Sequence, residues 1–217
     1  MSPAASPSRA RPRRPLSRER IVDAAIELVE RDGAEALSMR RLGAALGVEG
    51  MALYHHVAGR EELVRAIAER LLEPLRDLEP DADWREACRR FARALRAIAA
   101  RHPATFALVG LQPLRSPGSL LPVERLLGTL VAGGFPAPDA LAVYRAVASY
   151  ARGYALAEAT GFTVDATRAG GRERLATLDP GAFPILAGRA AQLASLDPDS
   201  AFERGLGALV DGLARRR

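Results

Sequence analysis

The sequence has no lysine, no asparagine, a single cysteine and no long apolar run. Because Cys88 is alone, an internal disulfide framework is excluded, and a lone thiol fits a reducing cytoplasm. We expect Cys88 to be a small buried hydrophobe. No stretch of 18 or more uncharged apolar residues occurs, so no membrane span is expected. The N-terminus lacks the apolar segment of a signal peptide, and the protein is therefore predicted to be cytoplasmic.

Positive charge is concentrated at the N-terminus. Residues 1–16 contain Arg9, Arg11, Arg13 and Arg14 and no acidic residue, so they contribute four units to the formal net charge of +5. We predict a disordered basic arm over these residues. Two interpretations of the arm stay open: it reaches DNA phosphates or a minor groove, or it is only a solvated tail.

Apolar residues recur with helical periodicity along the whole chain, and no alternating strand pattern competes. Ser17 and Ser38 are suited to cap the first two helices, and Gly33 and Gly47 to end them. The helices are expected at residues 18–32, 39–46, 49–55, 60–78, 84–100, 103–111, 120–132, 139–160, 183–196 and 200–213. The chain is therefore predicted to be all-α.

The segment LGVEG, residues 46–50, joins the second and third expected helices. A glycine and an apolar residue between two short amphipathic helices are typical of a helix-turn-helix, in which the second helix enters the major groove of DNA. Leu53 and Val57 would then face inward, with Val48 in the turn. The small or polar face opposite them consists of Glu49, Gly50, Met51 and Ala52.

These features resemble the TetR family of transcriptional regulators. The resemblance rests on SRERIVDAAIELVERDGAEALSMRRLGAALGVEGMALYHHVAGREELVRAI, residues 17–67. A weaker likeness to the tetracycline-repressor subgroup rests on LLGTLVAGGFPAPDALAVYRAVASYARGYALAEA and FERGLGALVDGLA. The resemblance implies an N-terminal three-helix helix-turn-helix DNA-binding domain at 17–62, after the arm at 1–16. A larger helical ligand-binding and dimerisation domain would follow at 63–217.

The same resemblance implies roles for single residues in DNA binding. Arg40 is placed to reach a base edge or a phosphate, and Tyr54 and His56 would hydrogen-bond phosphates. Met51 and Ala52 would touch a thymine methyl group. The full expected DNA-binding set is Arg40, Arg41, Glu49, Gly50, Met51, Ala52, Tyr54, His55, His56 and Arg60.

Several of these residues have alternative interpretations. Tyr54 could be a core aromatic, His55 a surface residue, and Arg41 a solvated charge. Gly50 is interpreted as a reading position without a side chain. A metal site at His55 and His56 is disfavoured, because adjacent helical residues point about 100° apart and no third ligand lies nearby. No metal or other cofactor is expected.

The expected DNA-binding domain is not basic overall. Residues 17–79 contain nine arginines and thirteen acidic residues, a net charge of −4. Binding would therefore depend on a few positioned arginines, on helix N-termini and on the arm.

Two C-terminal helices are expected to mediate association. Small residues recur along residues 139–160, at Ala142, Ala146, Ser149, Gly153 and Ala157. An apolar stripe on residues 200–213 consists of Phe202, Leu206, Leu209 and Leu213, and Gly205 and Gly207 lie between them. Either these faces form a homodimer as a four-helix bundle, as the resemblance favours, or they are internal core. A two-fold dimer predicts a palindromic operator.

The resemblance also places a pocket for a small, mostly apolar effector in the C-terminal region. The expected lining residues are Phe91, Leu95, His102, Phe106, Leu111, Gln112, Tyr150 and Tyr154, although each alone could be plain core. Tetracycline-binding members hold a drug-chelated magnesium through histidines of this region. Here Val109 falls at that place, so magnesium-tetracycline recognition is not expected.

The predicted function is therefore a ligand-responsive transcriptional regulator, most simply a repressor. The fourth helix, residues 60–78, would transmit ligand binding to the reading helices as a shift in population. An enzyme is disfavoured, because no phosphate-binding loop, dinucleotide fingerprint, catalytic triad spacing or metal cluster is present. The alternative is a helical small-molecule-binding protein that does not bind an operator. The net charge of −4 over residues 17–79 keeps this alternative open.

Overall fold

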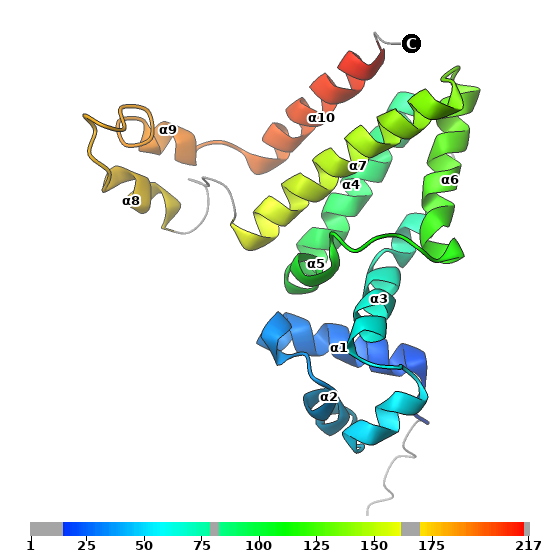
Figure 1. The fold of residues 1–217 in the computed structure, drawn as a ribbon. Coiled ribbons are helices and arrows are strands. Elements are labelled where there is room, and N and C mark those ends of the chain that lie inside the picture. Colours follow the sequence, from blue (N-terminus) through cyan, green and yellow to red (C-terminus); the bar gives the residue numbers. More distant parts are fainter. Residues whose placement is uncertain (1–14, 79–82, 162–169, 215–217) are drawn as a thin grey trace, which may run out of the picture.

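The computed structural model describes residues 15–78, 83–161 and 170–214, and these residues form helices joined by turns, without a strand. The predicted all-α class is thereby confirmed. Figure 1 shows a small N-terminal unit at one end of an elongated molecule and a larger helical bundle at the other. Most of the basic arm, residues 1–14, lies outside the described residues.

The first two helices follow the sequence signals closely. Helix α1 (Arg18–Asp32) begins where the Ser17 side chain accepts a hydrogen bond from the Arg20 amide at 3.3 Å, and it ends at Gly33, whose φ is 83°. A 3₁₀ turn, η1 (Ala34–Ala36), leads to α2 (Met39–Leu46), which Ser38 caps. The predicted bounds of both α-helices are confirmed.

The next two elements differ from the prediction in helix type and length. The expected third helix is a 3₁₀ helix, η2 (Gly50–His55). The expected helix from Arg60 to Leu78 is divided into α3 (Arg60–Leu71) and a 3₁₀ helix, η3 (Glu73–Asp77). Pro74 explains the division, because proline has no amide hydrogen to donate and its ring clashes with the preceding turn.

The larger bundle is built around two long helices. Helix α4 (Trp84–Arg101), capped by Asp83, packs along α7 (Ala137–Thr160), and α5 (Pro103–Val109) lies across their lower ends (Figure 1). Helix α6 (Pro117–Ala132) begins three residues before its predicted start, because Ser116 accepts a hydrogen bond from the Ser119 amide at 3.2 Å. The chain ends with α8 (Gly171–Ala176), α9 (Ala190–Ala194) and α10 (Pro198–Ala214).

The helix predicted over residues 183–196 is mostly wrong. Only α9 is α-helical there, and residues 181–189 form successive turns. Pro184 cannot donate a backbone hydrogen bond. In addition, Phe183 and Ile185 are 44% and 59% exposed, so no apolar face of this segment is buried to stabilise a regular helix.

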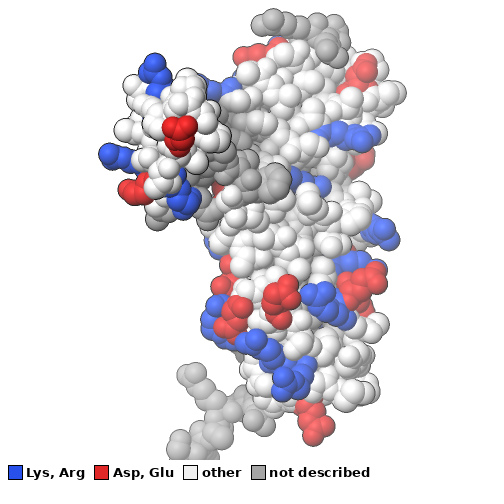
Figure 2. Space-filling view, turned by 60° about the vertical axis from the view of Figure 1, so that its left-hand side comes forward, with Lys and Arg blue, Asp and Glu red and all other residues white. Residues whose placement is uncertain are grey.

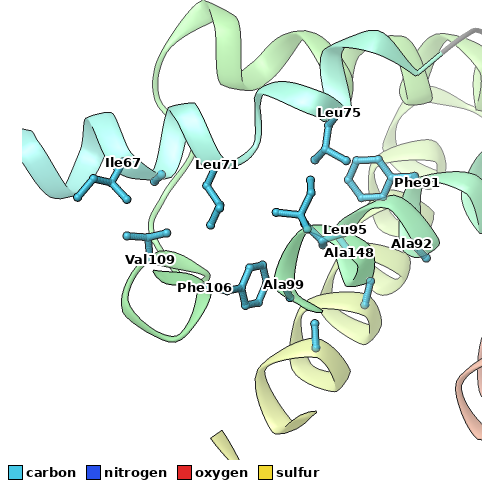
Figure 3. Close-up of a cluster of buried hydrophobic side chains, with 14 of the residues drawn as sticks. Ile67, Leu71, Leu75, Phe91, Ala92, Leu95, Ala99, Phe106, Val109 and Ala148 are labelled. Carbon is cyan, nitrogen blue, oxygen red and sulfur yellow. The ribbon is translucent and has the colours of Figure 1, made fainter. Parts of the chain in front are cut away.

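One continuous set of buried side chains runs from the N-terminal unit into the bundle. The four predicted core positions of the fourth helix (Leu63, Ile67, Leu71 and Leu75) are all buried. Figure 3 shows Leu71 and Leu75 of this stripe beside Phe106 and Phe91 of the bundle. The boundary between domains at residues 62 and 63 stays a prediction, because α3 packs against both halves.

Cys88 is fully buried in the bundle, as expected from the sequence. Burial raises the pKa of its thiol to about 12, because the charged thiolate is poorly solvated there. At neutral pH the side chain is therefore a protonated, apolar packing group.

Candidate functional site

The α2–η2 pair forms a compact helix-turn-helix at the end of the molecule remote from α10 (Figure 1). Gly47 ends α2 in the left-handed conformation, with φ 68° and ψ 33°, which favours glycine. The Val48 amide then donates to the Gly43 carbonyl at 2.9 Å. Leu53 of η2 and Val57, two residues after η2 ends, are almost fully buried, so both face inward as predicted.

Two glycines allow α2 and η2 to approach closely. A Cβ added to Gly43 would lie 2.9 Å from the Gly50 nitrogen and from the Val48 carbonyl oxygen. A Cβ added to Gly50 would lie 3.2 Å from the Met39 carbonyl oxygen. The backbone of η2 therefore rests directly on the backbone of α2. Gly43 is not among the residues expected from the sequence to form the site. Its signal was a glycine inside a short helix, which costs about 1 kcal/mol relative to alanine.

This contact corrects the interpretation of Gly50 as a reading position without a side chain. The Cβ direction at residue 50 points at the backbone of Met39 and Arg40, not into solvent. Glycine at this position is explained by packing. The interpretation of Tyr54 as a core aromatic is also wrong, because its side chain is 46% exposed.

All ten expected DNA-contact residues lie at the surface of this end of the molecule. The exposed members are Arg40, Arg41, Glu49, Met51, Tyr54, His55 and Arg60, and the half-buried members are Gly50, Ala52 and His56. Met51, at the tip of η2, is 72% exposed, an unusual position for a large apolar side chain. Their contacts with DNA stay a prediction.

Arg41 is already engaged within the chain. Its guanidinium lies 2.7 Å from Asp32 at the end of α1, and Asp32 also accepts a hydrogen bond from Arg31 at 2.9 Å. The Arg31 hydrogen bond, together with both positive charges, lowers the pKa of Asp32. Asp32 thus ties α2 to α1 and compensates part of the charge that Arg41 could offer to a phosphate.

Charges of both signs are intermixed on this unit. Figure 2 shows acidic and basic side chains beside one another over the lower part of the molecule, on the face turned to the viewer. This distribution agrees with the net charge of −4 over residues 17–79.

A carboxylate joins the N-terminal unit to the bundle. Glu30 of α1 accepts hydrogen bonds from the first amides of α5, 2.8 Å from the Thr105 nitrogen and 3.4 Å from the Ala104 nitrogen. A negative charge at a helix N-terminus satisfies free amides and is favoured by the helix dipole. The Thr105 side chain beneath it is fully buried, and its hydroxyl has no partner among the described residues. Sequence reasoning had missed Glu30, because residue spacing did not reveal this long-range contact.

The eight residues expected to line a ligand pocket do not surround one cavity. Phe91, Leu95 and Phe106 are buried in the core of Figure 3, and Leu111 is 72% exposed. Gln112 is half-buried in the loop after α5.

The other three lie elsewhere. Tyr150 and Tyr154 pack on Phe202 of α10, and their hydroxyls donate to the carbonyls of Phe202 at 2.8 Å and Pro198 at 3.2 Å. His102, between α4 and α5, faces a different cleft beside α1 and η3.

A cleft of about 460 Å³ lies between α4, α7 and α10. Arg96 dominates it: the guanidinium lies 2.7 Å and 2.8 Å from the two Glu158 oxygens and 2.8 Å from Asp199. It also stacks over Phe202, 4.7 Å from the ring centre. These bonds raise the pKa of Arg96, with Glu158 the main cause. Sequence reasoning had missed this group, which fastens α10 to α4 and α7.

The two faces expected to mediate association differ. On α7, Ala142, Ser149 and Gly153 are exposed, and a Cβ added to Gly153 would meet nothing within 4 Å. On α10, Phe202 and Leu206 are instead buried within the chain. Half of the predicted α10 stripe is therefore internal core, the alternative that the sequence left open.

Within the described residues, no group of three or more histidine, cysteine, aspartate or glutamate side chains could hold a metal ion. No helix among the described segments is long and apolar enough to cross a membrane.

Comparison with known proteins gives a consistent result. Residues 21–67 match the family model of bacterial regulatory proteins of the tetR family, and residues 76–217 match the tetracyclin repressor-like C-terminal domain. An HTH-type transcriptional regulator of Saccharopolyspora erythraea is 33% identical over 92% of this chain and 85% of its own length. The class A tetracycline repressor from transposon 1721 of Escherichia coli is 32% identical over 91% of this chain and 90% of its own length.

A solved structure is also similar. The Streptomyces coelicolor protein ActR, a TetR family protein crystallised with (S)-DNPA, superposes with a TM-score of 0.76 at 29% identity, covering 94% of this chain and all of ActR. Another structure of ActR contains actinorhodin.

Proposed function

The chain belongs to the TetR family of DNA-binding transcriptional regulators, and on that premise we propose that it is a ligand-responsive repressor. In this proposal it binds a palindromic operator as a homodimer and is released by a small, mostly apolar molecule. The observation that carries the proposal is the α2–η2 unit, with its exposed Met51 and Tyr54 on a rigid, backbone-packed support.

In the proposed complex η2 enters the major groove. Met51 would contact a thymine methyl group, which suits an apolar side chain that is exposed in the free protein. Arg40, Tyr54, His56 and Arg60 would position the unit through phosphates. Because Arg41 is bound to Asp32, its main proposed role is to orient α2 rather than to read a base.

Three features support a homodimer. The exposed small residues of α7 leave room for a second helix to approach closely, and Gly153 has no packing role inside the chain. Gly207 on α10 likewise meets nothing within 4 Å when a Cβ is added. The α8–α9 segment extends away from the bundle in Figure 1 and carries exposed Phe183 and Ile185, which a second copy would cover.

An effector site in the bundle is proposed by analogy with ActR, which has been crystallised with (S)-DNPA and with actinorhodin. The core between α3, α4 and α5 contains Phe91, Leu95 and Phe106, so it would take an apolar molecule after these side chains move apart. Val109 is buried and faces α3, and it offers no atom that could bind magnesium.

Transmission to DNA would then pass from α5 to α3, the first part of the segment 60–78 that is expected to transmit ligand binding. Helix α5 contacts α7 on one side and α1 and α3 on the other, and Glu30 binds its first turn. A ligand that binds better when α5 is in another position would change the distance between the two η2 helices of the dimer. Operator affinity would then fall, at most by the ratio of the ligand's affinities for the two states.

Selection of bound sequences from a random DNA library tests the operator proposal. The expected product is an inverted repeat whose half-sites are separated by about 10 base pairs or a multiple of this. Addition of (S)-DNPA or actinorhodin, the two molecules crystallised with ActR, to the selected complex tests release by an effector. Failure to enrich any sequence would instead favour a small-molecule-binding protein without an operator, the alternative suggested by the acidic balance of residues 17–79.

A further inference from the structure

A groove of about 670 Å³ lies on the side of α1, next to the end of α2. Its charged lining residues are Glu19, Arg20, Asp23 and Glu27, a net charge of −2, and its apolar lining includes Ala24, Ala45 and Leu46. This groove has no role in the DNA interface or in the effector site proposed above.

Three acidic residues of the groove lie along one face of α1. Glu19, Asp23 and Glu27 are spaced four residues apart, so one helical turn separates each from the next. At a rise of about 1.5 Å per residue, the row from Glu19 to Glu27 is about 12 Å long. Glu27 is exposed and forms no ion pair within the described ranges, whereas Asp23 is bound to Arg70 at 2.9 Å. The Glu19 amide keeps the pKa of its own carboxyl group low, so this group stays ionised.

The chain itself leads into this groove. Pro15 lines it, and the fourteen residues before Pro15 carry Arg9, Arg11, Arg13 and Arg14 without an acidic residue. In an extended segment alternate side chains point to the same side, with a rise of about 3.3 Å per residue. Arg9, Arg11 and Arg13 would therefore form a row about 13 Å long, close to the length of the acidic row on α1.

We propose that in the absence of DNA the N-terminal arm folds back into this groove, with Arg9, Arg11 and Arg13 facing Glu27, Asp23 and Glu19. The direction of the chain fits this order, because Arg13 is next to Pro15 at the Glu19 end. A tether of one or two residues also gives a high effective concentration at the groove. The docked arm is withheld from DNA phosphates, and DNA competes with α1 for the same arginines. The contact is an autoinhibitory surface for a segment of the same chain.

Limited trypsin digestion of the full chain tests the docking without DNA. The bonds after Arg9 and Arg13 are cleavable, since neither is followed by proline. At low ionic strength we expect cleavage of wild type to be slow, and the double variant Glu19→Gln/Glu27→Gln to be cleaved several-fold faster. High salt should remove this difference, because exposed charge pairs are screened. The matched control, Glu35→Gln/Glu61→Gln, neutralises two acids elsewhere on the same unit and should behave as wild type.

A second experiment measures the affinity of the protein for a 20-base-pair duplex of random sequence. The Glu19→Gln/Glu27→Gln variant should bind several-fold more tightly than wild type in the full chain. The same double substitution should increase DNA affinity much less after deletion of residues 1–14. A general effect of the added positive charge would instead be the same with and without these residues. Equal cleavage rates in wild type and the groove variant would overturn the proposal. Protection that increases with protein concentration would also overturn it, because the occupant would then be a second copy. Neither digestion result depends on operator recognition.

Discussion

Gly43 and Gly50 lie against each other across the helix-turn-helix, so closely that a Cβ on Gly43 would lie 2.9 Å from the Gly50 nitrogen. The position of η2, the element proposed to enter the major groove, is thus set by backbone contact with α2, and η2 has little space to shift. Because neither glycine has a positive φ, the contact and not the backbone conformation requires these residues.

The variant Gly43→Ala should therefore lower stability by about 1–3 kcal/mol, the usual range for overpacking, and weaken operator binding as η2 is displaced. Urea unfolding followed by circular dichroism measures the first effect and fluorescence anisotropy the second. The matched control is Gly128→Ala on α6, where an added Cβ meets nothing within 4 Å. That control should gain about 0.5–1 kcal/mol. Unchanged stability of Gly43→Ala would refute the backbone contact.

Removing the charge of Glu30 should loosen the connection between the two halves. The variant Glu30→Gln loses the charged acceptor at the start of α5, which is worth about 0.3–1 kcal/mol for a carboxylate near a helix N-terminus. Trp84, the only tryptophan, reports on the bundle alone. We expect urea transitions by Trp84 fluorescence and by circular dichroism to separate in Glu30→Gln and to coincide in wild type. Glu35→Gln, an exposed acid of η1, should leave them coincident.

Acid should destabilise the N-terminal unit through Glu62. Its carboxylate accepts a hydrogen bond from the Ala58 amide and pairs with Arg18, and these contacts lower its pKa, the Ala58 bond most strongly. A lowered folded-state pKa stabilises the fold above the unfolded value of about 4.3, and this contribution is lost as the pH falls through the folded value.

The stability difference between wild type and Glu62→Gln should accordingly be constant near neutral pH and shrink below about pH 4.3. Urea unfolding at a series of pH values measures it. A difference that persisted unchanged down to pH 2 would show that the charge of Glu62 is not the cause.

Deletion of residues 1–16 should make DNA binding less sensitive to salt. Affinity falls as the salt concentration rises, and each arginine that pairs with a phosphate steepens the plot of log affinity against log salt concentration by up to about 0.9. The arm contains four arginines. Affinity measured between about 50 and 200 mM salt gives the slope. An identical slope in both chains would remove the arm from DNA binding.

Introducing a large charged side chain on the exposed face of α7 should block association. Gly153→Arg meets no atom of its own chain within 4 Å of the new Cβ, so the fold should persist while the dimer dissociates. Sedimentation velocity should give a monomer for Gly153→Arg and a dimer for wild type. Ala58→Arg, exposed in the loop before α3, serves as the control and should remain a dimer.

Local signals in the sequence were sufficient for much of the fold. Ser17, Gly33, Ser38 and Gly47 define the ends of α1 and α2 because capping involves residues close in the chain. The periodic stripe from Leu63 to Leu75 predicted burial correctly even though Pro74 interrupts the helix. By contrast, apolar periodicity alone predicted a helix over residues 183–196, where the chain offers no surface to bury its apolar face.

The candidate sites were less accessible to sequence reasoning. The expected DNA-contact residues share one end of the molecule, since they follow one another in a short motif. The expected pocket residues come from four segments, and their relative positions depend on how α7 and α10 pack. Contacts such as Glu30 with Thr105 or Arg96 with Glu158 join residues more than 60 positions apart, and no local pattern predicts them.

The burial of Cys88 has a practical consequence for following motions in solution. Its thiol is fully inaccessible, and with a pKa of about 12 it remains protonated at the pH of maleimide labelling. A single cysteine placed on the arm or on η2 would thus carry a fluorophore at one defined position without removal of the native cysteine. In the proposed homodimer, the distance between two such probes would report directly whether an effector changes the spacing of the two η2 helices.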